Sequence, residues 1–225
     1  MVRILQVPVP PLFPTQGPVR VMLFGEAPGP LGADKSGIPF WGDRAGISVY
    51  RALEAAGLAV VPTEAYEDWD GQRLRDRGLR PELRGAALSN AHASCPTKDG
   101  QKFKAPTDAE LKAPGNLRRI GQELSEAIAR CEGTLRVIAM GRRAAWILAR
   151  VPEVGPFELS EMPHPSAQGL LQAAPDKGRG LKLADLREAW MERLVELLNP
   201  DPAGGVAGRS DTERAGSNAS PGPKA

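Results

Sequence analysis

The chain has 225 residues, of which 41% are hydrophobic, and a formal net charge of +2, which suits one domain with a sizeable core. It has no apolar run close to the roughly 20 residues that a membrane-spanning helix needs, and the apolar stretch before Pro8 is too short for a signal-peptide core. We therefore expect a cytoplasmic protein that is not attached to a membrane. The small net charge does not by itself indicate nucleic-acid binding, although a local basic patch could bind phosphates.

Composition divides the chain into three parts. Residues 1–18 are a proline-rich extension, and its segment Val7–Pro18 is expected to form an extended strap over the domain. Residues 19–198 are expected to form one domain. Residues 199–225 are rich in Gly, Pro, Ser, Ala and Asn and have too little apolar surface to offset the entropy of ordering, so we expect a disordered tail, with a DNA-scanning arm as the alternative.

Short apolar strands alternate with helices between residues 19 and 198. The predicted strands are Val19–Phe24, Ala86–Ser89 and Leu135–Met140, with Phe157–Met162 as a fourth candidate. The predicted helices are Gly46–Gly57, Leu117–Cys131, Arg142–Ala149 and Leu181–Leu198, and the charged stretch Asp70–Arg80 is a solvated helix or loop. This order predicts an α/β fold with three layers, α/β/α, in which helices flank a short, mainly parallel four-stranded sheet. Ligands of such sheets bind beyond the carboxyl ends of the strands.

The first loop, Gly25–Gly42, follows the first predicted strand and contains the sequences GEAPGPLG and GIPFWG. So many glycines and prolines predict a rigid loop whose backbone can closely approach a flat ligand. An ordinary strand-to-helix loop is the alternative, and the G-x-G-x-x-G pattern of dinucleotide sites is absent. The aromatic residues Phe40 and Trp41 could serve as stacking plates.

Two further polar clusters follow later strands. Asn90 ends the second strand; an Asn there is often only a turn former, but its carboxamide also matches the edge of a nucleobase. His164 lies between two prolines after the fourth candidate strand and is either a turn-capping histidine or a site residue. Leu170 and Leu171 follow it, either as core residues or as exposed side chains that could wedge into a base stack. The three clusters together predict a pocket for a planar heterocycle.

The patterns GEAPG…GIPFWG…AG, then SN…CP, then HPS resemble the uracil-DNA glycosylase superfamily over about Val19–Leu198. GEAPG, with Asp34 three residues before Gly37, is similar to the thermophile-type family 4 enzymes, whereas GPLGADKSGIPF is more similar to the single-strand-selective monofunctional uracil glycosylases. Family 4 enzymes carry an iron–sulfur cluster on four cysteines. This chain has two cysteines, without a C-x-x-C pair, and Ser94 stands at one expected ligand position, so we expect no cluster, metal or other cofactor.

The resemblance implies a role for each cluster. Phe40 would stack on a flipped-out base, Asn90 would bind the base's Watson–Crick edge, and His164, as a neutral donor, would stabilise charge developing at uracil O2. The remaining base-binding residues would be Gly25, Ala27, Pro28 and Gly29 of the first loop. Ser166 would hold a DNA phosphate, and the following segment would enter the gap in the base stack. The expected DNA contacts are Ser166, Ala167, Gln168, Gly169 and Leu170, with Leu170 as the preferred wedge.

One position departs from the most efficient superfamily members. Ala27 stands where they have the Asp that positions water, although family 4 enzymes also have Ala there and are active. Glu26 and Asp34 are candidates to replace the missing carboxylate, but an acidic loop residue is more often a cap or a solvated charge. No lysine lies at a motif position, so the resemblance implies a monofunctional glycosylase.

The expected function is therefore release of a deaminated base, uracil first, from DNA by a monomeric enzyme. Hypoxanthine and xanthine are alternative substrates, since hypoxanthine presents a lactam edge like that of uracil. A catalytically silent protein that binds damaged or single-stranded DNA is a second hypothesis. A metabolic enzyme that binds mononucleotides is a third, and the HPS cluster argues against it.

Overall fold

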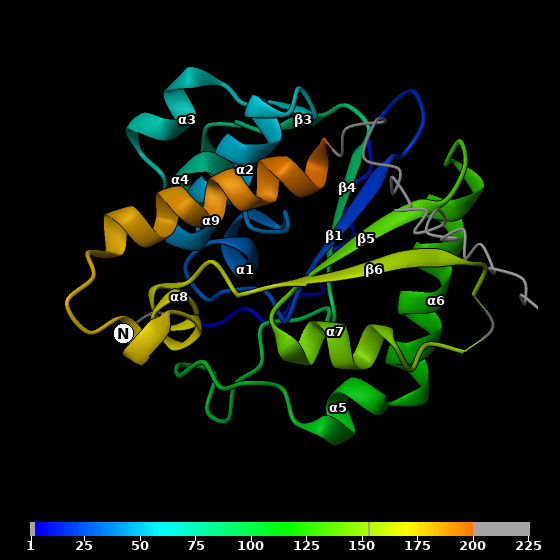
Figure 1. Ribbon diagram of the computed structural model, residues 1–225. Coiled ribbons are helices and arrows are strands. Elements are labelled where there is room, and N and C mark those ends of the chain that lie inside the picture. Colours follow the sequence, from blue (N-terminus) through cyan, green and yellow to red (C-terminus); the bar gives the residue numbers. More distant parts are fainter. Residues whose placement is uncertain (1–2, 153, 200–225) are drawn as a thin grey trace, which may run out of the picture.

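The computed structural model describes residues 3–152 and 154–199, which form three layers with helices on both faces of a four-stranded sheet (Figure 1). All neighbouring strands of this sheet run parallel, in the order β4-β1-β5-β6. Its strands are β1 (Val21–Gly25), β4 (Ala86–Asn90), β5 (Leu135–Met140) and β6 (Phe157–Met162). The predicted fold class and the fourth strand are confirmed. Residues 200–225, which hold nearly all of the expected disordered tail, lie outside the described part of the chain.

The helices connect and cover these strands. The longer ones are α2 (Arg44–Ala55), α6 (Pro114–Ala129), α7 (Arg142–Leu148), α8 (Ala167–Ala173) and α9 (Leu183–Leu198). The shorter ones are α1 (Ala33–Ser36), α3 (Thr63–Glu67), α4 (Gly71–Asp76), α5 (Asp108–Lys112) and the 3-10 turn η1 (Pro175–Gly178). A small antiparallel pair, β2 (Ala59–Val60) and β3 (Glu82–Leu83), lies apart from the main sheet. Among the described helices, none is long and apolar enough to cross a membrane.

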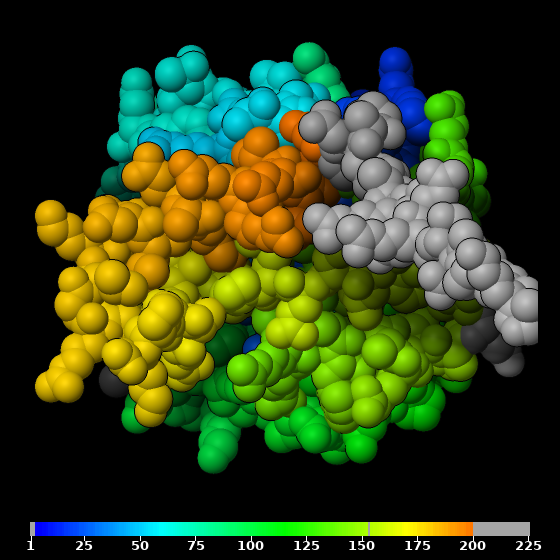
Figure 2. All heavy atoms as spheres, in the orientation of Figure 1, coloured from blue at the N-terminus to red at the C-terminus, as the bar shows by residue number. Residues whose placement is uncertain are grey.

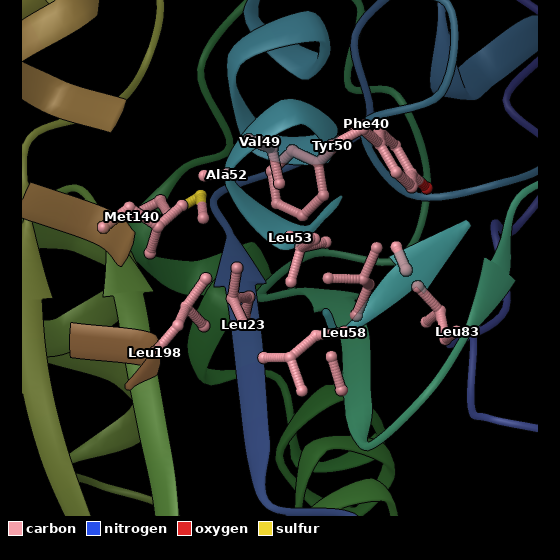
Figure 3. Close-up of a cluster of buried hydrophobic side chains, with 14 of the residues drawn as sticks. Leu23, Phe40, Val49, Tyr50, Ala52, Leu53, Leu58, Leu83, Met140 and Leu198 are labelled. Atoms are coloured by element: carbon pink, nitrogen blue, oxygen red, sulfur yellow. The ribbon is translucent and has the colours of Figure 1, made fainter. Parts of the chain in front are cut away.

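Each face of the sheet buries its own apolar cluster. On one face, Leu23 of β1 is fully buried, and Leu53 of α2 and Leu198 of α9 pack around it (Figure 3). On the other face, Phe24 packs with residues of α6 and α7. Neighbouring residues of β1 thus point to opposite cores, as a strand's period of two requires. Because burial of one such leucine stabilises the fold by roughly 2 kcal/mol, both faces of the strand fix its position.

The proline-rich N-terminal segment lies along the outer edge of β4. Leu12 pairs with Leu88 of β4 in an isolated antiparallel bridge, and the Val9 amide donates to the Ala93 carbonyl at 2.9 Å. These contacts agree with an extended strap. They also cover the backbone groups that an edge strand would otherwise expose.

Candidate active site

The three polar clusters meet where the parallel strands end. Asn90 and Gly25 are the last residues of β4 and β1, and they pair with each other. Gly141 follows β5, and its amide donates to the Met162 carbonyl of β6 at 2.7 Å. His164 comes two residues after Met162, the last residue of β6. A Cβ built on Gly141 would lie 3.6 Å from the Cβ of His164. Neighbouring strands are about 4.8 Å apart. The candidate residues therefore lie in a row along the carboxyl ends of the four parallel strands.

The side chain of Asn90 is buried and has an unused hydrogen-bond donor. Its residue is 3% exposed, and Nδ2 has no partner within the described part of the chain. Such a group costs free energy unless a ligand or water satisfies it. The main chain of Asn90, by contrast, is firmly held, because Nη2 of Arg119 donates to the Asn90 carbonyl at 2.9 Å and to the Ala91 carbonyl at 3.1 Å.

Arg119 belongs to a buried polar network that sequence reasoning missed. Its Nη1 lies 2.6 Å from Oε1 of Glu123, and Oε2 of Glu123 accepts a 2.6 Å hydrogen bond from the Ser89 hydroxyl. Arg119 and Glu123 have the i,i+4 spacing of an ordinary surface pair on a helix. The signal that could have indicated burial is Glu123's position next to Leu124, which belongs to the apolar face of α6.

Gly25 separates the Asn90 amide from the Phe40 ring. A Cβ built on Gly25 would lie 2.5 Å from Oδ1 of Asn90 and 3.0 Å from Cε1 of Phe40. A larger residue at this position would therefore displace one or both side chains. The amide and the aromatic ring are close enough to contact the edge and the face of one planar ligand.

Phe40 is held in a backbone conformation that non-glycine residues rarely adopt. Its φ is +61°, and such strain costs of order 1–3 kcal/mol and persists where the surrounding structure enforces it. The Tyr50 hydroxyl donates to the Pro39 carbonyl at 2.9 Å. A Cβ built on Gly46 would lie 1.6 Å from the Phe40 carbonyl oxygen, so only glycine fits there. The first loop thus holds Phe40 in one position, and the residue is 6% exposed and belongs to the same buried cluster as Tyr50 and Leu53 (Figure 3).

Asp43 shapes the rest of the first loop. Its Oδ2 accepts a hydrogen bond from the Ala33 amide at 3.2 Å, and a Cβ on Gly29 or Gly32 would lie within 2.6 Å of the Asp43 side chain. Burial raises the pKa of Asp43, and hydrogen bonds from backbone amides oppose that rise. Sequence reasoning missed Asp43, although an Asp just before a predicted helix is a common signal of a side chain that binds backbone amides.

Asp34 is used to hold the N-terminal strap. Its two carboxylate oxygens accept hydrogen bonds from the amides of Leu5 at 2.8 Å and Gln6 at 3.1 Å, and Lys35 Nζ lies 3.4 Å away. The side chain is 0% exposed. In this packing the Asp34 carboxylate binds the strap and is closed to solvent, which does not favour the predicted role of replacing the missing water-positioning carboxylate.

Glu26, the other candidate carboxylate, is placed differently. Its side chain is 28% exposed, and Oε1 lies 3.1 Å from Nε of Arg143 in a geometry that forms no hydrogen bond. Burial raises the pKa of Glu26, and the positive charge of Arg143 opposes that rise. Glu26 follows Gly25 directly and precedes Ala27, so its ion-paired carboxylate lies next to the carboxyl end of β1.

His164 is partly buried in a defined orientation. The Ser166 amide donates to Nδ1 of His164 at 3.2 Å, so Nδ1 is an acceptor and the neutral ring carries its proton on Nε2. Burial lowers the pKa of His164, which favours this neutral form. Trp190 of α9 donates to the Pro163 carbonyl at 2.8 Å and supports the segment from behind.

The residues expected to contact DNA form the start of α8. The hydroxyl of Ser166 caps this helix by accepting from the Gly169 amide at 3.1 Å. Gln168 is exposed, and Ala167 and Gly169 are partly exposed. Leu170 is only 5% exposed and belongs to the core cluster of α2 and α9. The prediction of Leu170 as an exposed wedge is therefore wrong in this packing, because the helical turn of α8 directs the side chain inward.

Comparison with known proteins decides the family. Residues 13–193 match the family model described as the uracil DNA glycosylase superfamily. The chain belongs to that superfamily. The finding confirms the resemblance of the three motifs at this level. A segment of 94 residues, 42% of this chain, is 37% identical to the type-5 uracil-DNA glycosylase of Thermus thermophilus, and it covers 36% of that relative, or about a third of its length.

The cysteines of this superfamily member do not fit the iron–sulfur cluster that family 4 enzymes carry. Such a cluster needs four thiolates, and the sequence has only Cys95 and Cys131. Cys95 is buried, and burial together with the charges of Asp34 and Asp43 raises its pKa to about 12, so the thiol stays protonated. Within residues 3–152 and 154–199, no three His, Cys, Asp or Glu side chains lie together as a metal site would require.

An open cavity of about 650 Å³ lies at the other end of the sheet, where the strands begin. It is lined by the strap and by residues next to β1 and β3, including Arg20, Glu82 and Arg84. None of the predicted site residues lines it. The superfamily motifs and this cavity are therefore separate features of the molecule.

Proposed function

We propose that the protein is a monofunctional DNA glycosylase that flips a deaminated base out of DNA and hydrolyses its N-glycosidic bond. The observation that carries the proposal is the buried, unpaired Nδ2 of Asn90 beside Gly25 and the Phe40 ring. A carboxamide offers one donor and one acceptor, which complement the O4 and N3–H of uracil. The aromatic ring would stack on the base while the amide binds its edge.

Bond cleavage leaves negative charge on the departing base and positive charge on the sugar. A neutral His164 with its proton on Nε2 suits the first requirement, because it can donate to the base oxygen that gains charge. The fixed tautomer and the lowered pKa both support this role. The side chain needs no proton transfer to act, so it stabilises the transition state by position alone.

A water must then attack the sugar carbon. Ala27 cannot orient a water, whereas the neighbouring Glu26 has a carboxylate whose Oε1 lies 3.1 Å from Nε of Arg143 and a side chain that is 28% exposed. We propose Glu26 as the residue that positions the water and stabilises the cationic sugar. Burial raises the pKa of Glu26, and the positive charge of Arg143, 3.1 Å away, opposes that rise.

Uracil is the substrate proposed first. The motif GEAPG resembles that of family 4 enzymes, and the Thermus thermophilus relative is named as a type-5 enzyme. Both names describe uracil-DNA glycosylases, so uracil in DNA is their shared substrate. Hypoxanthine and xanthine are the next candidates, because the Asn90 amide also complements the lactam edge of hypoxanthine.

A silent binder of damaged DNA is the second candidate function. It is favoured by one observation, the methyl side chain of Ala27 in place of a catalytic carboxylate. Such a protein would keep the affinity of the pocket for the lesion and release no base.

Base release from labelled oligonucleotides tests these proposals. Each oligonucleotide carries one uracil, hypoxanthine or xanthine, either single-stranded or opposite each normal base. The wild-type protein is compared with Asn90→Ala and His164→Ala, and Gln72→Ala, an exposed polar change on α4, is the control. Release that falls in the first two variants alone would support the glycosylase. No release from any substrate, with lesion-selective binding retained, would leave the silent binder.

A further inference from the structure

The loop after β4 presents an aromatic side chain to solvent. Phe103 is 48% exposed, and it is the one aromatic residue among the exposed large hydrophobic residues of the described part of the chain. About half of the surface of this residue is therefore covered by the protein and about half faces solvent. Its exposed face is available to a planar group from outside the molecule.

The backbone of this loop, residues 96–104, is well anchored. Thr97 and Phe103 form an isolated antiparallel bridge, and the Lys104 amide donates to the Pro96 carbonyl at 3.1 Å. Inside the loop, Oδ1 of Asp99 accepts from the amides of Gln101 at 3.0 Å and Lys102 at 2.8 Å. These bonds fix the backbone on both sides of Phe103, so little further ordering of the backbone is needed when the residue binds a partner.

Further contacts tie the loop to the candidate active site. The loop begins six residues after Asn90. Two residues after the loop ends, the Pro106 carbonyl accepts a hydrogen bond from Arg143, which also lies 3.1 Å from Glu26 of the first loop. The amide of Ile4 in the strap donates to the Gly100 carbonyl at 2.7 Å. The loop that carries Phe103 therefore follows β4 at one edge of the sheet, whereas α8 and η1, yellow in Figure 2, follow β6 at the other edge.

The charges around Phe103 suit a polyanion. Lys98 and Lys102 are exposed, and neither forms an ion pair with another residue of the described ranges. Lys104 is neutralised by Glu110, whose Oε1 is 2.7 Å away. Asp99 adds one negative charge to this loop, and its carboxylate is bound by the backbone amides of Gln101 and Lys102. An exposed aromatic residue with exposed lysines near it in the chain is a combination by which proteins bind unpaired bases and their phosphates.

We propose that Phe103 stacks on an unpaired base of the DNA strand next to the flipped nucleotide, while Lys98 and Lys102 contact its phosphates. This inference rests on the proposed function and adds a preference for single-stranded DNA. A base within a duplex is held in place by its pairing partner, so it is not free to turn toward Phe103. A base in a single strand is free to stack.

Binding of the full-length protein to fluorescent oligonucleotides tests the inference. Phe103→Ala is expected to weaken binding to a uracil-containing single strand about tenfold and to a matched duplex less than twofold. Phe103→Trp should restore single-strand binding. Leu159→Ala, which removes another exposed apolar side chain from β6, is the matched control and should bind as the wild type does.

A scan of abasic sites locates the stacked base. At one position beside the uracil, loss of the base should weaken wild-type binding and leave Phe103→Ala unaffected. Equal binding by Phe103→Ala and Leu159→Ala to every oligonucleotide would overturn the inference, and so would equal losses for single strand and duplex. Base release measured in the same samples separates this failure from that of the proposed function, because the wild type can release uracil whether or not Phe103 contributes.

Discussion

The backbone amide of Ser166 donates a hydrogen bond to Nδ1 of His164 at 3.2 Å. This contact fixes the tautomer, because an acceptor at Nδ1 leaves the single proton of the neutral ring on Nε2. Protonation of Nδ1 would replace an attraction with a clash between two donors. The local backbone thus opposes the cationic form, as does burial of the ring.

The pH dependence of base release follows from this arrangement. Burial lowers the pKa of His164 below its ordinary value of about 6.5, so the neutral donor should persist as the pH falls through 6.5. We expect the rate to hold at that pH and to fall only in more acid solution, as the ring becomes protonated. Rates across this range, with an NMR titration assigned by comparison with His92→Gln, provide the measurement. A rate that rises as His164 gains its proton would contradict the proposed role.

The close packing of Gly169 against His164 gives a second prediction. A Cβ at Gly169 would lie 2.3 Å from the His164 carbonyl oxygen and 3.0 Å from its Cβ. Gly169→Ala should therefore shift the histidine and reduce base release by about 100-fold, since displacements near 1 Å have such effects. Gly115→Ala in α6 is the control, because its Cβ meets no atom within 4 Å. Equal rates for the two variants would show that the position of this segment does not matter.

Two asparagines near the end of β4 should respond in opposite ways to alanine. The Asn90 Nδ2 lacks a protein partner, whereas Nδ2 of Asn116 donates to the carbonyls of Ala91 at 2.9 Å and Leu111 at 2.8 Å. Asn90→Ala should change the free energy of unfolding by less than about 1 kcal/mol and reduce base release by 100-fold or more. Asn116→Ala should cost about 1–3 kcal/mol of stability. Denaturant unfolding and base release, measured on both variants, check the pair, and a large stability loss in Asn90→Ala would argue for a structural role.

The sequence predicted the main sheet, and the position of the candidate residues after its strands, because those features depend on local patterns. Apolar runs gave β1, β4 and β5, and the helical period gave α2 and α9 with ends within two or three residues of those observed. The glycine-rich and polar clusters that follow the strands lie at one edge of the sheet, as parallel topology requires.

Long-range contacts decided what the sequence could not predict. Nothing near Asp34 indicates that its carboxylate binds amides 28 and 29 residues away. Likewise, the sequence of Leu170 and Leu171 after a polar loop is compatible with an exposed wedge and with a core position. The helical turn of α8 decides between them, because it buries Leu170. Short elements such as β2 and α5 also escaped prediction, because a few residues show no measurable period.

Asp34 and Glu26 should differ in what their loss affects. Asp34→Ala removes the acceptor of two strap amides and is expected to lower the free energy of unfolding by about 2–3 kcal/mol. Glu26→Gln keeps the size of a partly exposed side chain and should leave stability nearly unchanged while reducing base release about 100-fold. Thermal unfolding and single-turnover rates distinguish the two effects. If Glu26→Gln were fully active, another group would have to position the water.

Arg119 should stabilise the fold chiefly through Asn90 and Glu123. Its guanidinium donates to the Asn90 carbonyl and pairs with a Glu123 carboxylate whose side chain is only 7% exposed. Arg119→Ala would leave this buried charge unpaired, so the free energy of unfolding should fall by about 3–5 kcal/mol. Arg118→Ala, an exposed change one residue earlier on α6, should fall within about 0.5 kcal/mol of the wild type. Denaturant unfolding measures both changes. Similar stabilities for the two variants would mean that water solvates the Glu123 carboxylate when Arg119 is absent, and that the network does not hold the end of β4.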